Sequence, residues 1–393
     1  MTLATLMAIA ASLLLTPLAS ALAWKYNAVS RPDGQRRLHA RPTPLWGGSA
    51  IYLGLLLSIG VAYCLAADQF YFLSLPLGLA LSAGILCLLG CYDDLYELGP
   101  RTKLAGHIVA TLPILCAGGW AERLVLFGFP VELGIGGAVF AMVWLVLGMN
   151  ALNLLDGMDG LASVVGIAIA LAIAGIAAAE DHPAVMTLAL ALSGALGGFL
   201  VYNLPPAHIY LGDCGSTIIG ATLALLALRV AMPDSRTAHL GIALALMFVP
   251  ILDTALAVVR RTLTGRGWMT ADRGHLHHRL LDRGFTVWQA LSILGGFCLT
   301  TGLIAWGVAH YGYEALACGL LLALTATAVY ARLFGREEWT IGRTLLGRFA
   351  RRWLMRRGVS EPAALRVVGG DAEFVPDVRP NEEALPRPTR RAA

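Results

Sequence analysis

The chain has 393 residues, of which 57% are hydrophobic and only 14% are charged, and its formal net charge is +4. Soluble domains average about 25% charged residues, so this composition excludes an ordinary soluble enzyme and predicts a chain that crosses a membrane repeatedly. Nothing in the charge pattern points to a nucleic-acid partner.

Apolar runs of near-spanning length follow one another from the N-terminus onward. A helix needs about 20 residues to cross the hydrocarbon core of a bilayer, and the fourth run is the shortest. We therefore predict an all-α integral membrane protein with about eleven transmembrane helices. The runs cover residues 2–23, 46–67, 72–91, 104–119, 133–152, 161–179, 184–202, 214–232, 239–258, 288–309 and 313–331.

The distribution of Lys and Arg predicts the orientation of these helices. The first run ends in Ala-Leu-Ala like a signal peptide, but it lacks a basic n-region, which favours a retained helix. If the chain alternates from there, 26 of the 29 Lys and Arg fall on one side of the membrane. The positive-inside rule assigns that side to the cytoplasm, so we expect a periplasmic N-terminus and a cytoplasmic C-terminus.

The C-terminal tail differs in composition from the multi-span domain, which we place at residues 1–334. Within residues 335–368, Leu346, Phe349 and Trp353 recur at helical spacing among arginines. This pattern predicts a basic amphipathic helix on anionic lipid, with a merely solvated basic helix as the alternative. Residues 369–393 are rich in Pro, Glu and Arg, and we expect them to be disordered.

A basic segment and an acidic segment border the first predicted spans on the cytoplasmic side. Arg36–Gly48 includes Arg37 and His39, which suit phosphate groups, although ordinary positive-inside charge explains the segment equally well. In Gly90–Leu104, the adjacent Asp93 and Asp94 follow a span. Such a pair can hold Mg²⁺ or supply a general base, and a solvated acidic loop is the alternative.

The segment NALNLLDGMDG, Asn150–Gly160, ends a long apolar run with Asp156 and Asp159. A carboxylate at the bilayer centre costs roughly 2.5–3.5 kcal/mol, so acids at the end of a span usually mark a site. Their spacing predicts that both lie on one helix face, where they repel unless a cation or proton lies between them. A polar helix cap is the alternative for either acid alone.

Asp213 lies in a glycine-rich break, NLPPAHIYLGDCGSTIIG, just before another apolar run. An acid at that depth lines a polar cavity or meets a cation, unless it serves only as a helix cap. In the long loop that follows residue 258, His275, His277 and His278 are flanked by Arg273 and Arg279. Zinc binding is one reading, but the arginines oppose a cation and favour a diphosphate.

Taken together, these clusters resemble the polyprenyl-phosphate N-acetylhexosamine-1-phosphate transferases, known in older usage as glycosyltransferase family 4. The nearest branch is the enterobacterial-type undecaprenyl-phosphate α-N-acetylglucosaminyl 1-phosphate transferase. The resemblance covers about residues 31–284, and its NAxNxxDGxDG and HxHH motifs are specific in combination. The sequence departs from the family at Glu97, where relatives often have Asp, and at Arg37, where Lys is common.

The resemblance implies transfer of a sugar 1-phosphate, chiefly N-acetylglucosamine 1-phosphate, from a UDP-N-acetylhexosamine to undecaprenyl phosphate, with release of UMP. It further implies Mg²⁺, or Mn²⁺ in its place, and an active site on the cytoplasmic face of a bacterial inner membrane. This would be the first membrane step of a cell-surface glycan such as the O-antigen of lipopolysaccharide. A UDP-sugar of the fucosamine or quinovosamine type is the alternative donor. The sequence is also compatible with a homo-oligomer.

The resemblance also implies residue roles. The expected catalytic residues are Asp93, Asp94, Asp156 and Asp159, and the expected metal ligand is Asp213, assisted by Asp94 or Asp156. The expected substrate-binding residues are Arg37, His39, Lys103, Asn153, Arg273, His275, His277 and His278. Asp156 as a covalent nucleophile is the alternative to direct transfer. Two other classes compete with an enzyme: a transporter, disfavoured because no internal repeat is evident and the acids lie at span ends, and a non-catalytic scaffold.

Overall fold

The structure, a computed structural model, describes residues 2–31, 41–65, 74–126, 128–234, 236–263 and 274–330. The predicted site residues Arg37, His39 and Arg273 lie outside these ranges, and so does the tail from residue 331 onward. The predicted domain boundary at 334, the amphipathic segment 335–368 and the disordered segment 369–393 therefore stay predictions.

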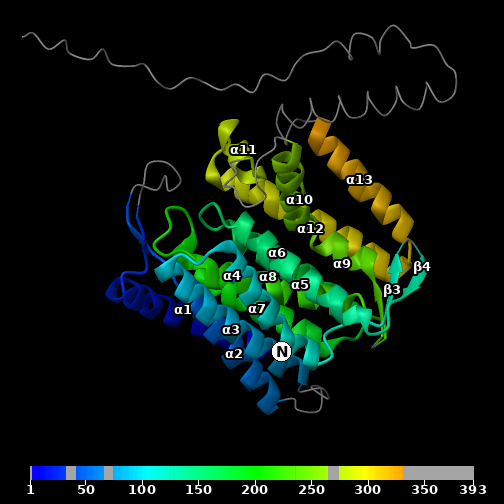
Figure 1. Ribbon diagram of the computed structural model, residues 1–393, viewed down its shortest axis with the longest axis horizontal. Helices are drawn as coiled ribbons and strands as arrows, with labels where there is room; N and C mark the ends of the chain where they lie inside the picture. Colours follow the sequence, from blue (N-terminus) through cyan, green and yellow to red (C-terminus); the bar gives the residue numbers. More distant parts are fainter. Residues whose placement is uncertain are drawn as a thin grey trace, which may run out of the picture. The chain divides into compact units, whose positions relative to one another are not determined.

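A helix, or a pair of helices, lies at each of the eleven predicted apolar runs (Figure 1). The prediction of an all-α integral membrane protein is confirmed. The helices are α1 (Thr2–Lys25), α2 (Gly47–Leu65), α3 (Ser74–Tyr96), α4 (Pro100–Cys116), α5 (Gly136–Leu155), α6 (Leu161–Ala179), α7 (Pro183–Asn203), α8 (Gly212–Val230), α9 (Leu240–Leu246), α10 (Phe248–Leu263), α12 (Val287–Tyr311) and α13 (Glu314–Tyr330), with the short α11 (Leu276–Asp282) before α12.

Not all of these helices have the length of a full span. Within the described ranges, 8 helices are long and apolar enough to cross a membrane, or up to 9 if the bent pair α9 and α10 forms one span. That pair replaces the single helix predicted over 239–258, and its two halves are bent by 81°. Pro250, in the first turn of α10, has no N–H to donate to the carbonyl of Leu246, so one continuous helix is disfavoured there.

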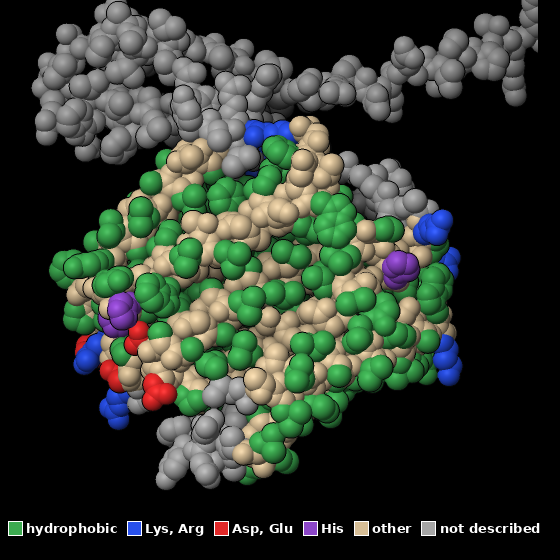
Figure 2. All heavy atoms as spheres, turned by 180° about the vertical axis from the view of Figure 1, so that it is seen from behind, with side chains coloured by type: hydrophobic (Ala, Val, Ile, Leu, Met, Phe, Trp, Pro, Cys, Tyr) green, Lys and Arg blue, Asp and Glu red, His purple; other side chains and the backbone are tan. Residues whose placement is uncertain are grey.

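Helix α8 lies at the centre of the bundle, packed against α2, α3, α5 and α6. Every residue from Cys214 to Leu228 is buried. Close approach to α5 depends on Gly148 and Gly220, because a Cβ on either one would overlap the backbone or side chain of the facing helix. Figure 2 shows a face covered by hydrophobic side chains in its middle, with charged side chains near its margins. Such a surface suits lipid rather than water.

Among the residues that the structure describes, two small sheets lie in the connections between helices, at opposite ends of the bundle. At one end, β3 (Arg123–Leu126) pairs antiparallel with β4 (Phe129–Glu132) and parallel with β5 (Thr237–His239). At the other end, β1 (Val29–Ser30) pairs antiparallel with β2 (Thr43–Pro44), and the backbone of Tyr210 donates to Pro44. This second end also holds the last turn of α3, the first turns of α4 and α8, and the break between α5 and α6.

Candidate functional site

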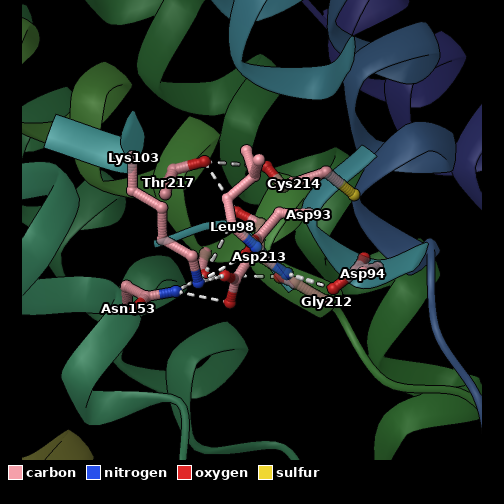
Figure 3. A network of polar contacts seen from close by, with 10 residues as sticks. Asp93, Asp94, Leu98, Lys103, Asn153, Gly212, Asp213, Cys214 and Thr217 are labelled. Atoms are coloured by element: carbon pink, nitrogen blue, oxygen red, sulfur yellow. Dashed lines mark hydrogen bonds and ion pairs between the residues drawn. The ribbon is translucent and has the colours of Figure 1, made fainter. Parts of the chain in front are cut away.

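Lys103 joins two carboxylates that come from two other helices (Figure 3). Its Nζ forms an ion pair with Oδ2 of Asp93, near the end of α3, and lies 2.6 Å from Oδ2 of Asp213, in the first turn of α8. Lys103 is the fourth residue of α4, and its side chain is only 34% exposed. Burial and the short distance make this a tightly held charge cluster, unlike an exposed surface pair.

Asp94 and Asn153 extend the cluster on either side of Asp213. Oδ1 of Asp94 accepts the backbone N–H of Asp213 at 3.2 Å. Nδ2 of Asn153, at the end of α5, donates to Oδ1 of Asp213 at 2.9 Å and to the hydroxyl of Ser216 at 3.0 Å. Residues that the sequence predicted from three separate segments therefore meet around one carboxylate.

The close approach of α3 and α8 brings these groups together. A Cβ on Gly90, one turn before Asp93, would overlap the backbone of Cys214. Only glycine permits the two helices to approach so closely at this point. Because Cys214 directly follows Asp213, the contact at Gly90 sets the position of Asp213 relative to Asp93 and Asp94.

The acids of the 150–160 segment do not share a helix face, so that prediction was wrong. Helix α5 ends at Leu155, Asp156 follows as its C-cap, and Asp159 lies in the turn before α6. Gly160 adopts a left-handed conformation, φ 75°, which stops the helix from running through the segment. The two carboxylates are therefore placed by a turn, and each can meet different partners.

Asp159 is tied to the loop between α7 and α8. Its Oδ2 accepts the backbone N–H of Ala207 at 2.9 Å. Close by, Oδ1 of the buried Asn203 accepts the N–H of Gly160 at 3.1 Å, while its Nδ2 donates to the carbonyl of Ile209 at 2.9 Å. Asn203 was not predicted; its position at the end of an apolar run, before Pro205, was the available signal.

Asp156 has an unusual protonation equilibrium. Burial, followed by repulsion from Asp213 and Asp159, raises the pKa of its carboxyl to about 7. The charge on Asp213 therefore acts on Asp156 although the two lie in different segments. Placing the proton on Asp156 lowers the repulsion among the acids while Lys103 balances Asp93 and Asp213.

The predicted histidines lie at α11, against the same end of the bundle. Nδ1 of His275 lies 2.8 Å from Oδ2 of Asp253 in α10, whose other oxygen accepts the N–H of Leu276 at 2.9 Å. The ring of His277 is 1% exposed, and neither of its nitrogens has a hydrogen-bond partner among the described residues. His278 packs on it, with the ring centroids 4.1 Å apart.

His277 connects this histidine cluster to the acidic segment. A Cβ on Gly157, next to Asp156, would overlap Nε2 of His277. Burial, followed by repulsion from His278, lowers the pKa of His277 to about 3. An unpartnered, neutral imidazole beside the acidic turn is ready to donate to an anion without first breaking a hydrogen bond.

A closed metal site is not seen in the described part of the chain, where no group of three or more His, Cys, Asp or Glu side chains could hold an ion. Mg²⁺, however, usually binds one or two carboxylates and takes its remaining ligands from water and substrate phosphates. Oδ2 of Asp94 is buried without a partner among these residues, beside Asp213. An orphaned carboxylate oxygen and a second carboxylate are a donor set that fits Mg²⁺.

Comparison with known proteins finds a matching family profile and relatives that align with most of this chain. A sequence profile described as glycosyl transferase family 4 matches residues 76–231. Decaprenyl-phosphate N-acetylglucosaminephosphotransferase of Mycolicibacterium smegmatis is 33% identical, over 80% of this chain and 84% of the relative. The undecaprenyl-phosphate alpha-N-acetylglucosaminyl 1-phosphate transferase of Thermotoga maritima is 31% identical, over 79% of this chain and 93% of the relative. The protein of the same name from Escherichia coli O157:H7 is 27% identical, over 86% of this chain and 92% of the relative.

Proposed function

The chain belongs to glycosyl transferase family 4, and we propose on this premise that it transfers N-acetylglucosamine 1-phosphate from UDP-N-acetylglucosamine to undecaprenyl phosphate, releasing UMP. Membership of the family makes it a membrane-bound transferase. The names of the relatives support N-acetylglucosamine phosphate as the transferred group and a polyprenyl phosphate as the acceptor. A UDP-fucosamine- or quinovosamine-type donor is the alternative within the same reaction.

The observation that carries this proposal is the Lys103 cluster. Both substrates of the reaction are anions, a nucleotide diphosphate and a lipid phosphate, so their mutual repulsion opposes the attack. The cluster joins one cation, Lys103, to carboxylates that suit a second cation, at a bundle end where α3, α4, α5 and α8 meet. Positive charge placed where phosphate charge develops is the principal means of catalysing phosphoryl transfer.

In the proposed reaction, an oxygen of the lipid phosphate attacks the phosphorus that carries the sugar, and the bond from that phosphorus to the UMP oxygen breaks. Asp93 orients the lipid phosphate or accepts its proton. Because the second pKa of a phosphate monoester is about 6, most of the acceptor is already dianionic at pH 7 and orientation dominates. Lys103 neutralises the charge that develops on the transferred phosphoryl oxygens.

Asp213 and Asp94 would hold Mg²⁺, or Mn²⁺ in its place, with Asp156 close enough to sense the charge on Asp213. The ion, when bound, neutralises diphosphate oxygens and makes UMP a better leaving group. Asn153 orients Asp213 through its amide hydrogen bond. Removing bound metal with a chelator should abolish transfer, and added Mg²⁺ should restore it.

The acidic turn and the histidines would contact the nucleotide diphosphate. The unpartnered ring of His277 and its neighbour His278 donate to phosphate oxygens, while Asp253 holds His275 in one orientation. Asp159 keeps the turn against the 204–211 loop. Arg37, His39 and Arg273 are proposed to add positive charge to the same region.

The proposed location is a bacterial inner membrane, with this end of the bundle facing the cytoplasm, where UDP-sugars are made. The positive-inside rule supports this orientation, because 26 of the 29 Lys and Arg are predicted to lie on the same side of the membrane as the site. The proposed role is the first membrane step of a cell-surface glycan such as O-antigen. A homo-oligomer is compatible with the site, which is assembled here from one chain.

One assay tests the proposal. Purified protein in lipid is incubated with undecaprenyl phosphate, Mg²⁺ and each of a panel of UDP-sugars, and the lipid product is analysed by mass spectrometry together with UMP release. We expect a lipid diphosphate-sugar with N-acetylglucosamine. A product only from another UDP-amino sugar would correct the donor, and no UMP with any sugar would overturn the reaction.

The same preparation separates direct transfer from a two-step route through Asp156. Direct transfer predicts no exchange of labelled UMP into UDP-sugar when lipid is absent. Exchange without lipid, accompanied by a phosphosugar covalently trapped on Asp156, would instead establish the two-step route.

A further inference from the structure

A small cavity lies one helical turn deeper in the bundle than the Lys103 ion pairs. Its volume is about 10 Å³, and it is lined by residues of α3, α4 and α8. Asp93, Lys103 and Asp213 form its outer wall, while Gly90, His107 and Thr217 each lie one turn deeper on the same three helices. The cavity is therefore the floor of the proposed active site.

His107 is the titratable residue in this floor, and the proposed reaction does not use it. It follows Lys103 by four residues on α4, so the two side chains lie on one helix face. The residue is 6% exposed, and its Nδ1 is buried with no hydrogen-bond partner among the described residues. A buried polar atom left without a partner costs about 1–3 kcal/mol, so the fold retains His107 at a cost that needs a reason.

The size and lining of the cavity suit one water molecule. About 10–15 Å³ of such space is what a single water requires, together with two to four polar partners. Lys103 has three N–H groups, of which two face Asp93 and Asp213. His107, whose Nδ1 has no partner among the described residues, lines the space one turn below Lys103. Thr217 lines it from α8, and its hydroxyl, which donates to the backbone carbonyl of Asp213 at 2.7 Å, still has lone pairs that can accept.

We propose that His107 is a positioning residue that holds one water in this cavity and, through it, fixes the Lys103 ammonium between Asp93 and Asp213. The water accepts an N–H of Lys103 and donates to the imidazole nitrogen. Without this support, the flexible lysine side chain samples other rotamers, and its charge is less often where the phosphoryl oxygens need it. The role rests on the proposed function, because its kinetic effect is read from UMP release.

Two isosteric substitutions separate hydrogen bonding from packing. His107→Leu and His107→Asn remove the same part of the ring and leave nearly the same space, but only Asn keeps a polar group near the position of Nδ1. We expect kcat to fall about tenfold in the Leu variant and less than about threefold in the Asn variant, as expected for loss of one hydrogen bond. KM for the UDP-sugar should be unchanged in both, because Lys103 acts on the developing charge.

A thermodynamic cycle tests the connection to Lys103 without any need for turnover. Melting temperatures of His107→Leu, Lys103→Met and the double variant are measured in lipid nanodiscs. If the water joins the two residues, the melting temperature of the double variant should fall by less than the sum of the falls in the two single variants. Additive losses would overturn the connection, and equal falls of kcat in the Leu and Asn variants, or none in Leu, would overturn the positioning role.

These outcomes differ from failure of the proposed function. Absence of UMP release from the wild-type protein would overturn the transferase proposal, whereas the melting cycle would still decide whether His107 and Lys103 interact.

Discussion

His277 lies directly against the backbone of Gly157, so close that any side chain at Gly157 would overlap Nε2 of the imidazole. The contact joins α11 to the turn that carries Asp156, and it links two segments separated by more than a hundred residues. Because both are proposed to face the nucleotide diphosphate, their spacing should control the reaction.

Gly157→Ala should therefore displace His277 and lower kcat/KM by about 10²-fold, since an error of about 1 Å in positioning can have that effect. The matched control is Gly175→Ala in α6, where an added Cβ meets nothing within 4 Å. UMP release from both variants checks this. Full activity in Gly157→Ala would mean that His277 does not act at the site.

Protonation of His277 should make the protein less stable in acid. Its pKa is lowered by burial to about 3, below the ordinary value of 6.5, so between these values the unfolded chain binds a proton that the folded chain excludes. Stability is then lost as the pH falls below about 6.5, by about 2 kcal/mol at pH 5 for this one group. Melting temperatures of wild type and His277→Asn at pH 7.5 and pH 5 measure it. Acidification should lower the melting temperature of the variant less than that of the wild type. Equal falls would contradict a lowered pKa of His277 in the folded protein.

Removal of the Asp253 carboxylate should destabilise the α10–α11 connection. Asp253→Ala leaves Nδ1 of His275 and the N–H of Leu276 without partners, at a cost of about 3 kcal/mol. Asp253→Asn keeps an acceptor for Leu276, so its melting temperature should fall less. Asp282→Ala, an exposed acid at the end of α11, serves as the control and should melt like wild type. Identical melting of the Ala and Asn variants would show that the hydrogen bond to Leu276 does not contribute, and wild-type melting of the Ala variant would show that neither contact does.

Substitution of Asp213 should change the requirement for Mg²⁺. Asp213→Asn removes a charge but keeps the shape, so kcat should fall about 10²-fold and half-maximal activity should need at least about tenfold more Mg²⁺. The control is Asp234→Asn, an exposed acid beyond the other end of α8. Wild-type activity with an unchanged Mg²⁺ titration in Asp213→Asn would rule out its role as a ligand.

Much of the fold is predictable from local composition. Long apolar runs must become helices in lipid, because no water is present to satisfy the backbone, so α1 to α8 appear where the runs do. The ninth run shows the limit of this reasoning. Hydropathy averages over residues and does not register that Pro250 removes one N–H, and the run therefore breaks into α9 and α10.

For the site, the residue types were readable but their partners were not. Asp93, Lys103, Asn153 and Asp213 stand out because charged and amide groups are rare at the ends of apolar runs. That Lys103 is shared between Asp93 and Asp213 depends instead on how α3, α4 and α8 pack. His107 illustrates the difference. In the sequence it is one polar residue within an apolar run, and only the structure shows that it lines the same cavity as Lys103.

The sequence by itself determined the class of protein, the location of the helices and the set of polar segments that gather at one end of the bundle. These follow from burial free energy and from the alternation of spans, which act through composition and order along the chain. Only the tertiary structure decided that Asp156 and Asp159 lie in a turn, that His277 meets Gly157, and that Lys103 joins two helices. Such contacts depend on helix approach at glycines such as Gly90, at distances of a few ångströms that no pattern along the chain encodes.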